Sequence, residues 1–287
     1  VSAFQSPALV GPIYQQLSSC VCSSLHDSRP AARSSSRAVG LCTMSTPVAV
    51  GDSDGACRIA IPASLSNTYF AVRHGHAVNN LESIISSSPD VGTKIHPLTE
   101  LGKEQAAESS SALCAAIQTA VVKRGKAFAH ILAFTSDFTR ARETSVFCLN
   151  ALAPLCLDGK EVGHIEAVLT TELRERWFGD LDDTIVTNYN MVWPSDMKDA
   201  RSDAGYKCEP VEKVVERVHS LIARLEAEHQ DTAIAFFSHA DTVQILQTWM
   251  SGADVRTFSQ FRFKNGEVRE LVLNDPESLP CPQPLDL

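Results

Sequence analysis

The sequence predicts an α/β fold: a three-layer sandwich with a mainly parallel central sheet, helices on both faces and an antiparallel hairpin at one edge. From about residue 65, strand-like and helix-like segments alternate along the chain. Such alternation is typical of a parallel sheet that is covered on both faces. Near the end, Lys264-Asn265-Gly266-Glu267 links two alternating runs, as in a hairpin with a type I′ turn. That hairpin would supply the antiparallel edge.

The expected strands are short, largely apolar runs. The first spans residues 67–72 and contains Tyr69-Phe70-Ala71-Val72. The others are expected at residues 130–135, 164–170 and 232–237. Largely apolar runs of this length fit strands that are buried on both faces of a sheet.

The expected helices carry apolar residues at helical spacing. The first spans residues 101–123, and the Thr99 hydroxyl stands where it can cap the start of this helix. A second helix is expected at residues 140–153, and an amphipathic one at residues 211–229. A last helix follows the fourth strand and runs through Met250.

One long segment has no periodic pattern. Residues 179–210 contain Pro194, Gly205 and Pro210 and show neither a helical nor a strand period. A long irregular insert inside a domain is more often a lid or a substrate loop than filler. We therefore expect this insert to contact the substrate.

The first part of the chain differs in composition from the rest. Residues 1–43 are rich in serine, contain three arginines and have a single acid, Asp27. This composition resembles an organellar transit peptide, which would place the protein in a mitochondrion or plastid. Met44 is an alternative start, with residues 1–43 untranslated and the protein cytoplasmic. Both interpretations stay open. We predict a disordered extension over residues 1–60 and a single catalytic domain over residues 61–287.

Composition excludes several classes of function. The net charge of −9 over 287 residues argues against a general nucleic-acid or anionic-membrane binder. No stretch approaches the roughly 20 apolar residues that a membrane span needs. The nine cysteines are scattered without CxxC spacing, so reduced thiols are expected rather than a zinc site or disulfides. We expect no metal and no other cofactor. The oligomeric state stays open.

Four polar clusters follow the predicted strands. They are Arg73-His74-Gly75, residues 136–144, residues 172–179, and Ser238-His239-Ala240-Asp241. The carboxyl ends of parallel strands meet at one edge of a sheet, so these clusters can converge on one cleft. Arginine binds phosphate oxygens with a planar fork, and imidazole can attack phosphorus. The clusters therefore indicate phosphoryl chemistry.

In order and spacing, these clusters resemble the histidine phosphatase superfamily, in the branch of the cofactor-dependent phosphoglycerate mutases and their phosphatase relatives. The resemblance covers about residues 68–250. The matching segments are Val72-Arg73-His74-Gly75 with Asn80, Pro97-Leu98-Thr99-Glu100-Leu101-Gly102 with Gln105-Ala106, Ser136 with Arg140-Ala141 and Glu143-Thr144, Leu173-Arg174-Glu175-Arg176 with Gly179, and Ser238-His239.

The resemblance implies a role for individual residues. His74 would attack phosphorus and carry a transient phosphohistidine, and Glu175 would protonate the leaving alcohol. The remaining residues would surround the phosphoryl group: Arg73, Arg140 and His239 would hold its oxygens, and Asn80 would line its pocket. These groups also suit phosphoryl transfer on physical grounds, because that reaction needs positioning and neutralisation of the oxygen charges.

Two other acids are alternatives to Glu175 as the proton donor. Glu172 lies three residues earlier. Asp241 follows His239 with one residue between them, whereas more distant relatives place an aspartate directly after this histidine. We prefer Glu175. Either Arg174 or Arg176 is expected to form an ion pair with it.

The insert distinguishes between two reactions. A mutase must hold a second acidic group, but residues 179–210 offer only Lys198, Arg201 and Lys207, among six aspartates. We therefore predict a metal-independent phosphatase, a histidine-type phosphomonoester hydrolase, that acts on small phosphate monoesters. A cofactor-dependent phosphoglycerate mutase is the alternative. A further alternative is an inactive relative that binds phosphorylated ligands, although such proteins usually lose one of the functional residues.

Overall fold

The computed structural model describes residues 55–152, 156–157, 160–161 and 164–285. Residues 1–54, with most of the predicted extension and with Met44, lie outside the described residues. None of the described helices is both long and apolar enough to span a membrane.

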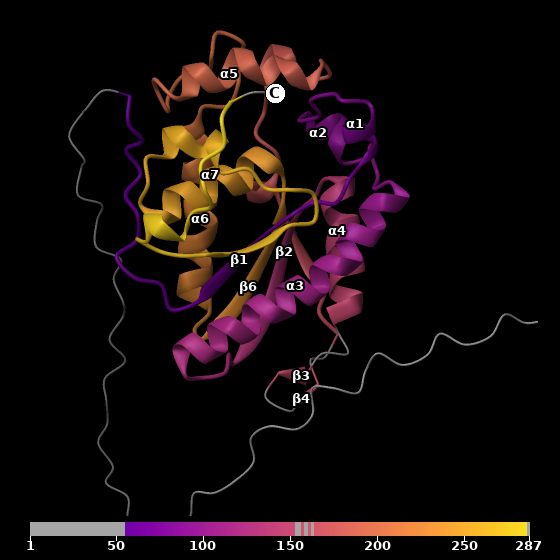
Figure 1. Ribbon diagram of the computed structural model, residues 1–287, viewed down its shortest axis with the longest axis vertical. Helices are drawn as coiled ribbons and strands as arrows, with labels where there is room; N and C mark the ends of the chain where they lie inside the picture. Colours follow the sequence, from indigo (N-terminus) through magenta and orange to yellow (C-terminus); the bar gives the residue numbers. More distant parts are fainter. Residues whose placement is uncertain (1–54, 153–155, 158–159, 162–163, 286–287) are drawn as a thin grey trace, which may run out of the picture. The chain divides into compact units, whose positions relative to one another are not determined.

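A five-stranded sheet lies at the centre of the described domain, with the strand order β5-β2-β6-β1-β7 (Figure 1). Its strands are β1 (Thr68–Arg73), β2 (His130–Ser136), β5 (Ala167–Thr170), β6 (Thr232–Ser238) and β7 (Val268–Leu271). The first four are parallel to their neighbours, whereas β7 is antiparallel to β1. The predicted mainly parallel sheet with an antiparallel edge is therefore confirmed.

Helices cover both faces of the sheet (Figure 1). One face packs against α3 (Glu100–Arg124) and α4 (Thr139–Leu152), and the other against α6 (Val211–Glu228) and α7 (Ala240–Ser251). The Thr99 hydroxyl accepts a hydrogen bond from the Gly102 amide at 3.2 Å, which is the expected cap of α3. Apolar side chains on both faces of β1 and β6 are buried beneath these helices, which explains their largely apolar sequences.

The predicted type I′ hairpin is wrong, although a turn does occur at residues 264–267. The Glu267 amide donates to the Lys264 carbonyl at 3.1 Å, and Gly266 has a φ of +73°. A type I′ turn also needs a positive φ at Asn265, which is not found, and no strand precedes the turn. β7 instead pairs with β1, whose open edge offers backbone groups that need partners.

The insert is more ordered than its sequence pattern predicts. It contains α5 (Tyr189–Asp196) and the one-turn 3-10 helices Gly179–Leu181 and Val186–Asn188. Pro194 lies inside α5. Packing outweighs this unfavourable proline, because Trp193 is buried and its ring stacks on that of Tyr189 with centroids 5.0 Å apart.

Short elements complete the domain. They are α1 (Val78–Leu81), α2 (Pro89–Gly92), the strand pair β3 (Cys156–Leu157) and β4 (Lys160–Glu161), and 3-10 helices at Thr171–Leu173, Val255–Gln260 and Pro276–Ser278. The insert joins the segment after β1 through a bridge between Ile84 and Ile185.

The packed domain begins before the predicted boundary at residue 61. The Ile59 carbonyl accepts a hydrogen bond from the Trp249 indole at 3.0 Å, and Arg58 forms an ion pair with Glu212 at 3.0 Å. Cys57 and Ile59 pack against the core beside α6 and α7. Residues 55–60 therefore pack with the domain. Their composition alone resembles that of a linker, and the apolar contacts and the ion pair that attach them could not be read from it.

Candidate active site

His74 lies directly after β1 and is almost fully buried, with 2% of its surface exposed. Its Nδ1 atom lies 2.8 Å from the Gly75 carbonyl oxygen. A carbonyl can only accept, so the proton of the neutral ring is on Nδ1 and the lone pair is on Nε2. Burial, and then the charges of Arg140 and Arg73, hold the pKa of His74 well below its usual range. At neutral pH the residue is therefore an uncharged imidazole with a nucleophilic Nε2.

Arg140, near the start of α4, faces that nitrogen. Its Nε atom donates to His74 Nε2 at 3.2 Å, and one terminal nitrogen donates to the Ser86 carbonyl at 2.8 Å. Its side chain is buried, and burial lowers the pKa of Arg140 to about 10. The guanidinium therefore stays charged at neutral pH beside the atom that would attack phosphorus.

His239, at the end of β6, lies on another side of His74, with ring centroids 5.2 Å apart. Its Nε2 atom is 2.9 Å from the Ser136 hydroxyl. That hydroxyl accepts from the Phe138 amide and can donate its own proton to Nε2, which leaves the ring proton of His239 on Nδ1. The Nδ1 atom is buried and has no hydrogen-bond partner among the described residues. A buried polar atom without a partner is costly, and here it is a potential donor to an oxyanion.

Arg73, the last residue of β1, is fixed from the far end of the chain. One terminal nitrogen donates to the Phe263 carbonyl at 2.6 Å, and the amide of Gly266 donates to the Arg73 carbonyl at 3.1 Å. Its Nε atom is buried without a partner in the described part of the chain. The turn at residues 264–267 thus positions Arg73 rather than forming the predicted hairpin.

Glu175 completes the group of five residues that we call the His74 cluster: Arg73, His74, Arg140, Glu175 and His239. Its Oε1 atom accepts from the Arg176 amide at 2.9 Å and from the Thr242 amide at 3.4 Å. Burial raises the pKa of Glu175, although the nearby Arg140 and Arg73 charges act in the opposite direction. A carboxyl group with a raised pKa holds its proton closer to neutral pH, as a general acid requires.

The two alternative acids have different surroundings. Glu172 accepts from the Thr170 hydroxyl and pairs with Arg224 at 3.3 Å, so its carboxylate is engaged by residues outside the His74 cluster. Asp241 is buried beside Arg176, whose Nη1 atom is 3.5 Å from its Oδ2 atom. Its pKa is raised by burial.

The expectation that Arg174 or Arg176 forms an ion pair with Glu175 is wrong. Arg174 pairs with Asp137, with one hydrogen bond of 2.8 Å. Arg176 is fully buried and forms a two-point contact with Asp196 at 2.6 and 2.8 Å. Each arginine is thus paired with an aspartate from another part of the fold. Glu175 instead accepts hydrogen bonds from backbone amides and lies in the electrostatic field of Arg140 and Arg73.

Asn80 lines a pocket of about 200 Å³ that also includes Arg73. We call this the Asp241 pocket; its other lining residues are Asn79, Ile84, Val186, Tyr189, Trp193, Ala240, Asp241, Gln244, Arg262 and Phe263. The Asn80 Oδ1 atom accepts from the Ala77 amide at 3.0 Å and from the Asn265 amide group at 3.4 Å. Asn80 thus also fixes the segment after His74, and its predicted place in the phosphate pocket stays a prediction.

Other motif residues support the site without belonging to the cluster. The Thr144 hydroxyl accepts from the Gly75 amide at 3.0 Å, and the Gln105 side chain accepts from the His76 amide at 2.8 Å. Gly75 and Gly102 approach so closely that a Cβ atom on either would overlap a backbone carbonyl oxygen of the other segment. The segment that carries His74 is therefore locked against the first turn of α3.

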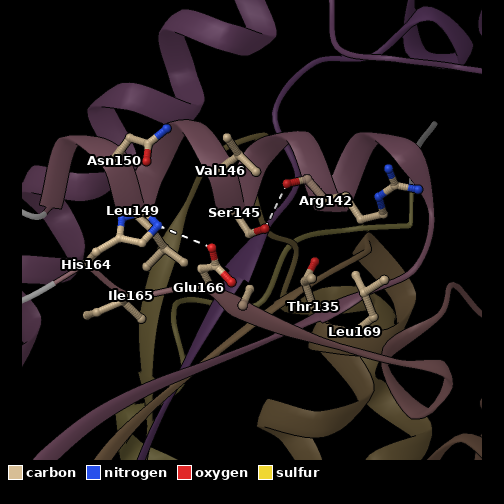
Figure 2. A pocket seen from close by; sticks show the side chains of 11 residues that line it. Thr135, Arg142, Ser145, Val146, Leu149, Asn150, His164, Ile165, Glu166 and Leu169 are labelled. Carbon is tan, nitrogen blue, oxygen red and sulfur yellow. Dashed lines mark hydrogen bonds and ion pairs between the residues drawn. The ribbon is translucent and has the colours of Figure 1, made fainter.

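A larger hollow lies elsewhere, between α4 and β5. This α4/β5 groove has a volume of about 400 Å³, and Figure 2 shows its lining, with Arg142, Ser145 and Leu149 on α4 opposite Glu166 and Leu169. His164 and Glu166 form its only ion pair among the residues drawn, at 3.5 Å. None of the five residues of the His74 cluster lines it.

Sequence reasoning missed several residues that shape the site. The Phe263 carbonyl and the Asn265 side chain come from the segment taken for a hairpin, and Tyr189 comes from the unpatterned insert. Asn79 also lines the pocket. Its position next to Asn80, which the resemblance had matched, was the one signal in the sequence that could have identified it. In the described part of the chain, no group of three or more His, Cys, Asp or Glu side chains is placed to hold a metal ion.

Two mycobacterial proteins are among the solved structures that share this fold. Mycobacterial glucosyl-3-phosphoglycerate phosphatase, in complex with VO3, is 21% identical with a TM-score of 0.53, and the match covers 71% of this chain and 91% of that chain. Mycobacterial hydrolase 2 is 19% identical with a TM-score of 0.53, and the match covers 74% and 86% of the two chains. No curated protein sequence matches the chain.

The family comparison covers both the fold and the site. The model of the histidine phosphatase superfamily (branch 1) matches residues 69–278, which is more than half of the chain and includes every residue of the His74 cluster. The protein therefore belongs to the histidine phosphatase superfamily (branch 1).

Proposed function

We propose that this protein is a phosphatase that hydrolyses small phosphate monoesters through a phosphohistidine at His74, without the help of a metal ion. One observation carries the proposal: the Gly75 carbonyl fixes the proton of His74 on Nδ1, and Nε2 faces the Arg140 guanidinium. The nucleophilic lone pair and the charge that would neutralise phosphoryl oxygens thus lie within 3.2 Å of each other.

In the first step, His74 Nε2 forms a bond to phosphorus while the bond from phosphorus to the ester oxygen breaks. The electron pair of that bond goes to the leaving oxygen, which takes a proton from the Glu175 carboxyl. Arg140, Arg73 and the buried Nδ1 of His239 would bind the three phosphoryl oxygens. Two of these residues have a buried nitrogen without a partner, which supports an oxyanion as their ligand.

In the second step, water attacks the phosphorus of phosphohistidine. The Glu175 carboxylate takes a proton from this water, the bond between nitrogen and phosphorus breaks, and His74 regains its lone pair. Glu175 thus returns to its acid form and the product is inorganic phosphate. The cycle needs no oxidant, reductant or second substrate.

The comparisons support this proposal at the level of reaction class. The neighbour in complex with VO3 is named a phosphatase, and vanadate, like phosphate, is an oxyanion. The insert favours water over a second phosphorylated acceptor, because Lys207 pairs with Asp180 at 2.9 Å and Arg201 with Asp199 at 3.1 Å. Cations engaged in this way are poor receptors for a second acidic group of the substrate.

A rapid-quench experiment tests the proposal. The full chain is mixed with a ³²P-labelled monoester in the presence of EDTA and quenched within milliseconds in alkaline detergent, because phosphohistidine is stable in alkali and is hydrolysed in acid. We expect an acid-labile label on the wild type, none on His74→Ala, and continuous phosphate release that EDTA does not reduce. Turnover with no trapped label on the wild type at any quench time, or turnover by His74→Ala at the wild-type rate, would contradict the proposal.

Two further measurements on the same protein separate the alternatives. A phosphoglycerate mutase would interconvert 3-phosphoglycerate and 2-phosphoglycerate in the presence of bisphosphoglycerate faster than it releases phosphate. An inactive relative would bind a phosphorylated ligand without label on His74 and without turnover.

A further inference from the structure

The Asp241 pocket adjoins the His74 cluster through Arg73, which belongs to both. On the proposed function, Arg73 binds phosphoryl oxygens, so the part of the substrate beyond the phosphoryl group enters this pocket. The groups that line it therefore select the substrate, and two of them have hydrogen-bonding capacity that the protein does not use.

Asn79 is the first of these groups. Its side chain is buried, with 6% of the residue exposed, and its Oδ1 atom has no hydrogen-bond partner in the described part of the chain. A buried amide without a partner costs free energy unless a ligand or water satisfies it. Because Asn79 lines the pocket, a ligand there can supply the missing bond.

Asp241 is the second group, with 2% of the residue exposed. Its Oδ2 atom accepts from the Trp193 indole at 3.2 Å and lies 3.5 Å from Arg176. Among the described residues, its Oδ1 atom accepts one hydrogen bond, a long one of 3.5 Å from the Gln244 amide group. A carboxylate oxygen has two lone pairs, so Oδ1 can accept further hydrogen bonds from a ligand in the pocket.

The rest of the lining includes three aromatic rings and two arginines, Arg73 and Arg262. Tyr189, Trp193 and Phe263 present ring surfaces, and Arg262 stacks on Trp193 with its guanidinium carbon 5.3 Å from the ring centroid while donating to the Pro284 carbonyl at 2.9 Å. A volume of about 200 Å³ equals roughly six or seven water molecules, which suits a few hydroxylated carbons rather than a nucleoside.

We propose that the Asp241 pocket binds an uncharged, hydroxylated substituent, so that the substrate is the monophosphate of a polyol or sugar without a second anionic group. The two unused positions, Asn79 Oδ1 and Asp241 Oδ1, are both acceptors, so a substituent with two hydroxyls can donate one hydrogen bond to each. Ring faces pack well against the C–H surface of such a substituent. A carboxylate or second phosphate would lie against the ionised Asp241 carboxylate, while Arg73 would be engaged by the phosphoryl group and Arg262 already stacks on Trp193 and donates to the Pro284 carbonyl. An ammonium group would be repelled by both arginines.

A matched pair of substrates tests this proposal. Glycerol 3-phosphate and 3-phosphoglycerate have the same number of carbons and differ chiefly in a hydroxymethyl group against a carboxylate. At pH 8, above the value of about 7 to which burial raises the pKa of Asp241, we expect kcat/KM to be at least about tenfold higher for glycerol 3-phosphate. p-Nitrophenyl phosphate serves as a reference that depends on the His74 cluster but not on hydroxyl recognition.

Two variants assign the preference to the pocket. Asp241→Asn removes the charge at constant shape and should reduce the ratio of the two kcat/KM values at least about fivefold. Asn79→Leu removes the amide at similar size and should lower kcat/KM for glycerol 3-phosphate relative to p-nitrophenyl phosphate by about tenfold. Asp275→Asn, which makes the same change at an exposed position, is the control and should leave both ratios unchanged.

The outcomes separate this inference from the proposed function. If the protein hydrolyses p-nitrophenyl phosphate but its kcat/KM for 3-phosphoglycerate equals or exceeds that for glycerol 3-phosphate, the inference is overturned and the proposed phosphatase function stands. A preference for glycerol 3-phosphate that neither variant changes would also overturn it, because the preference would then arise outside the pocket. Failure to hydrolyse any of the three esters would refute the proposed function, and the inference with it.

Discussion

The His74 cluster and the α4/β5 groove show that volume alone does not identify a reactive site. The groove is twice the size of the Asp241 pocket, about 400 Å³ against about 200 Å³, and it also contains a histidine, an acid and an arginine (Figure 2). Yet His164 and Glu166 have exposed side-chain fractions of 64% and 86%, whereas His74 is 2% exposed. Water screens the charges in the groove, but in the cluster buried groups act on one another directly.

The largest expected effect compares the two histidines. His74→Ala removes the nucleophile and should lower kcat/KM for phosphate esters by at least about 10⁴-fold. His164→Ala removes an exposed imidazole of the groove and should change it less than about twofold. Steady-state phosphate release with both purified variants measures the difference. Comparable losses in the two variants would mean that the groove takes part in the reaction.

Two arginines on α4 give the next comparison. Arg140→Ala removes a buried cation beside His74 and should lower kcat by about 10²- to 10³-fold. Arg142→Ala, two residues further along the helix and exposed in the groove, should lower it less than about twofold. Circular dichroism of both variants checks that α4 remains folded. A small effect of Arg140→Ala in a folded protein would refute the role of this guanidinium in binding the phosphoryl group.

Glu175→Gln tests the proton donor at about the same scale, but only for some substrates. An alkyl phosphate has a poor leaving group, so its hydrolysis should slow by about 10²- to 10³-fold. p-Nitrophenolate leaves without a proton, so the first step with p-nitrophenyl phosphate should be nearly unchanged. The burst of p-nitrophenol in a stopped-flow experiment measures that step. Equal losses for both substrates would argue for a structural role of Glu175 and would reopen the case for Asp241.

The smallest expected effect is in the pH profile. The acid form of Glu175 is the active form in the first step, and burial raises its pKa. The rate on an alkyl ester should therefore be maintained to higher pH than it would be with a carboxyl group of ordinary pKa. Above the pKa of Glu175, the rate should fall about tenfold per pH unit. His74 acts as the neutral base, and its pKa is held well below 6.5, so its protonation should reduce the rate only at clearly acidic pH. The alkaline fall should disappear in Glu175→Gln, and its persistence would assign it to another group.

The sequence predicted the parts of the site that depend on local order along the chain. Arg73 ends a strand, and His74 and His239 directly follow strands, whose apolar runs are easy to recognise. Arg140 lies in the first turn of the helix that follows β2. Because parallel strands present their carboxyl ends at one edge of the sheet, their convergence followed from the fold class. The roles of these residues in catalysis stay predictions that the experiments above test.

The parts that could not be predicted depend on contacts between distant segments. Nothing near Phe263 in the sequence indicates that its carbonyl binds Arg73, and an Asn-Gly turn is ordinarily a hairpin signal. Likewise, α5 forms around a proline because Trp193 and Tyr189 pack into the core, a tertiary effect that outweighs local propensity. The third strand begins at Ala167 rather than at residue 164, since an edge strand has one neighbour to extend it.

The contact between Gly75 and Gly102 has a consequence for how this chain can change over time. A Cβ atom at Gly75 would overlap the Gly102 carbonyl oxygen, and one at Gly102 would overlap the His76 carbonyl oxygen. Any replacement at either position would therefore displace the loop that carries His74. In a saturation library screened first for folded protein and then for turnover, both codons should return as glycine at the second screen. Variants that pass only the first screen would fold but not turn over substrate, which would show that these two glycines are needed for activity beyond what folding requires.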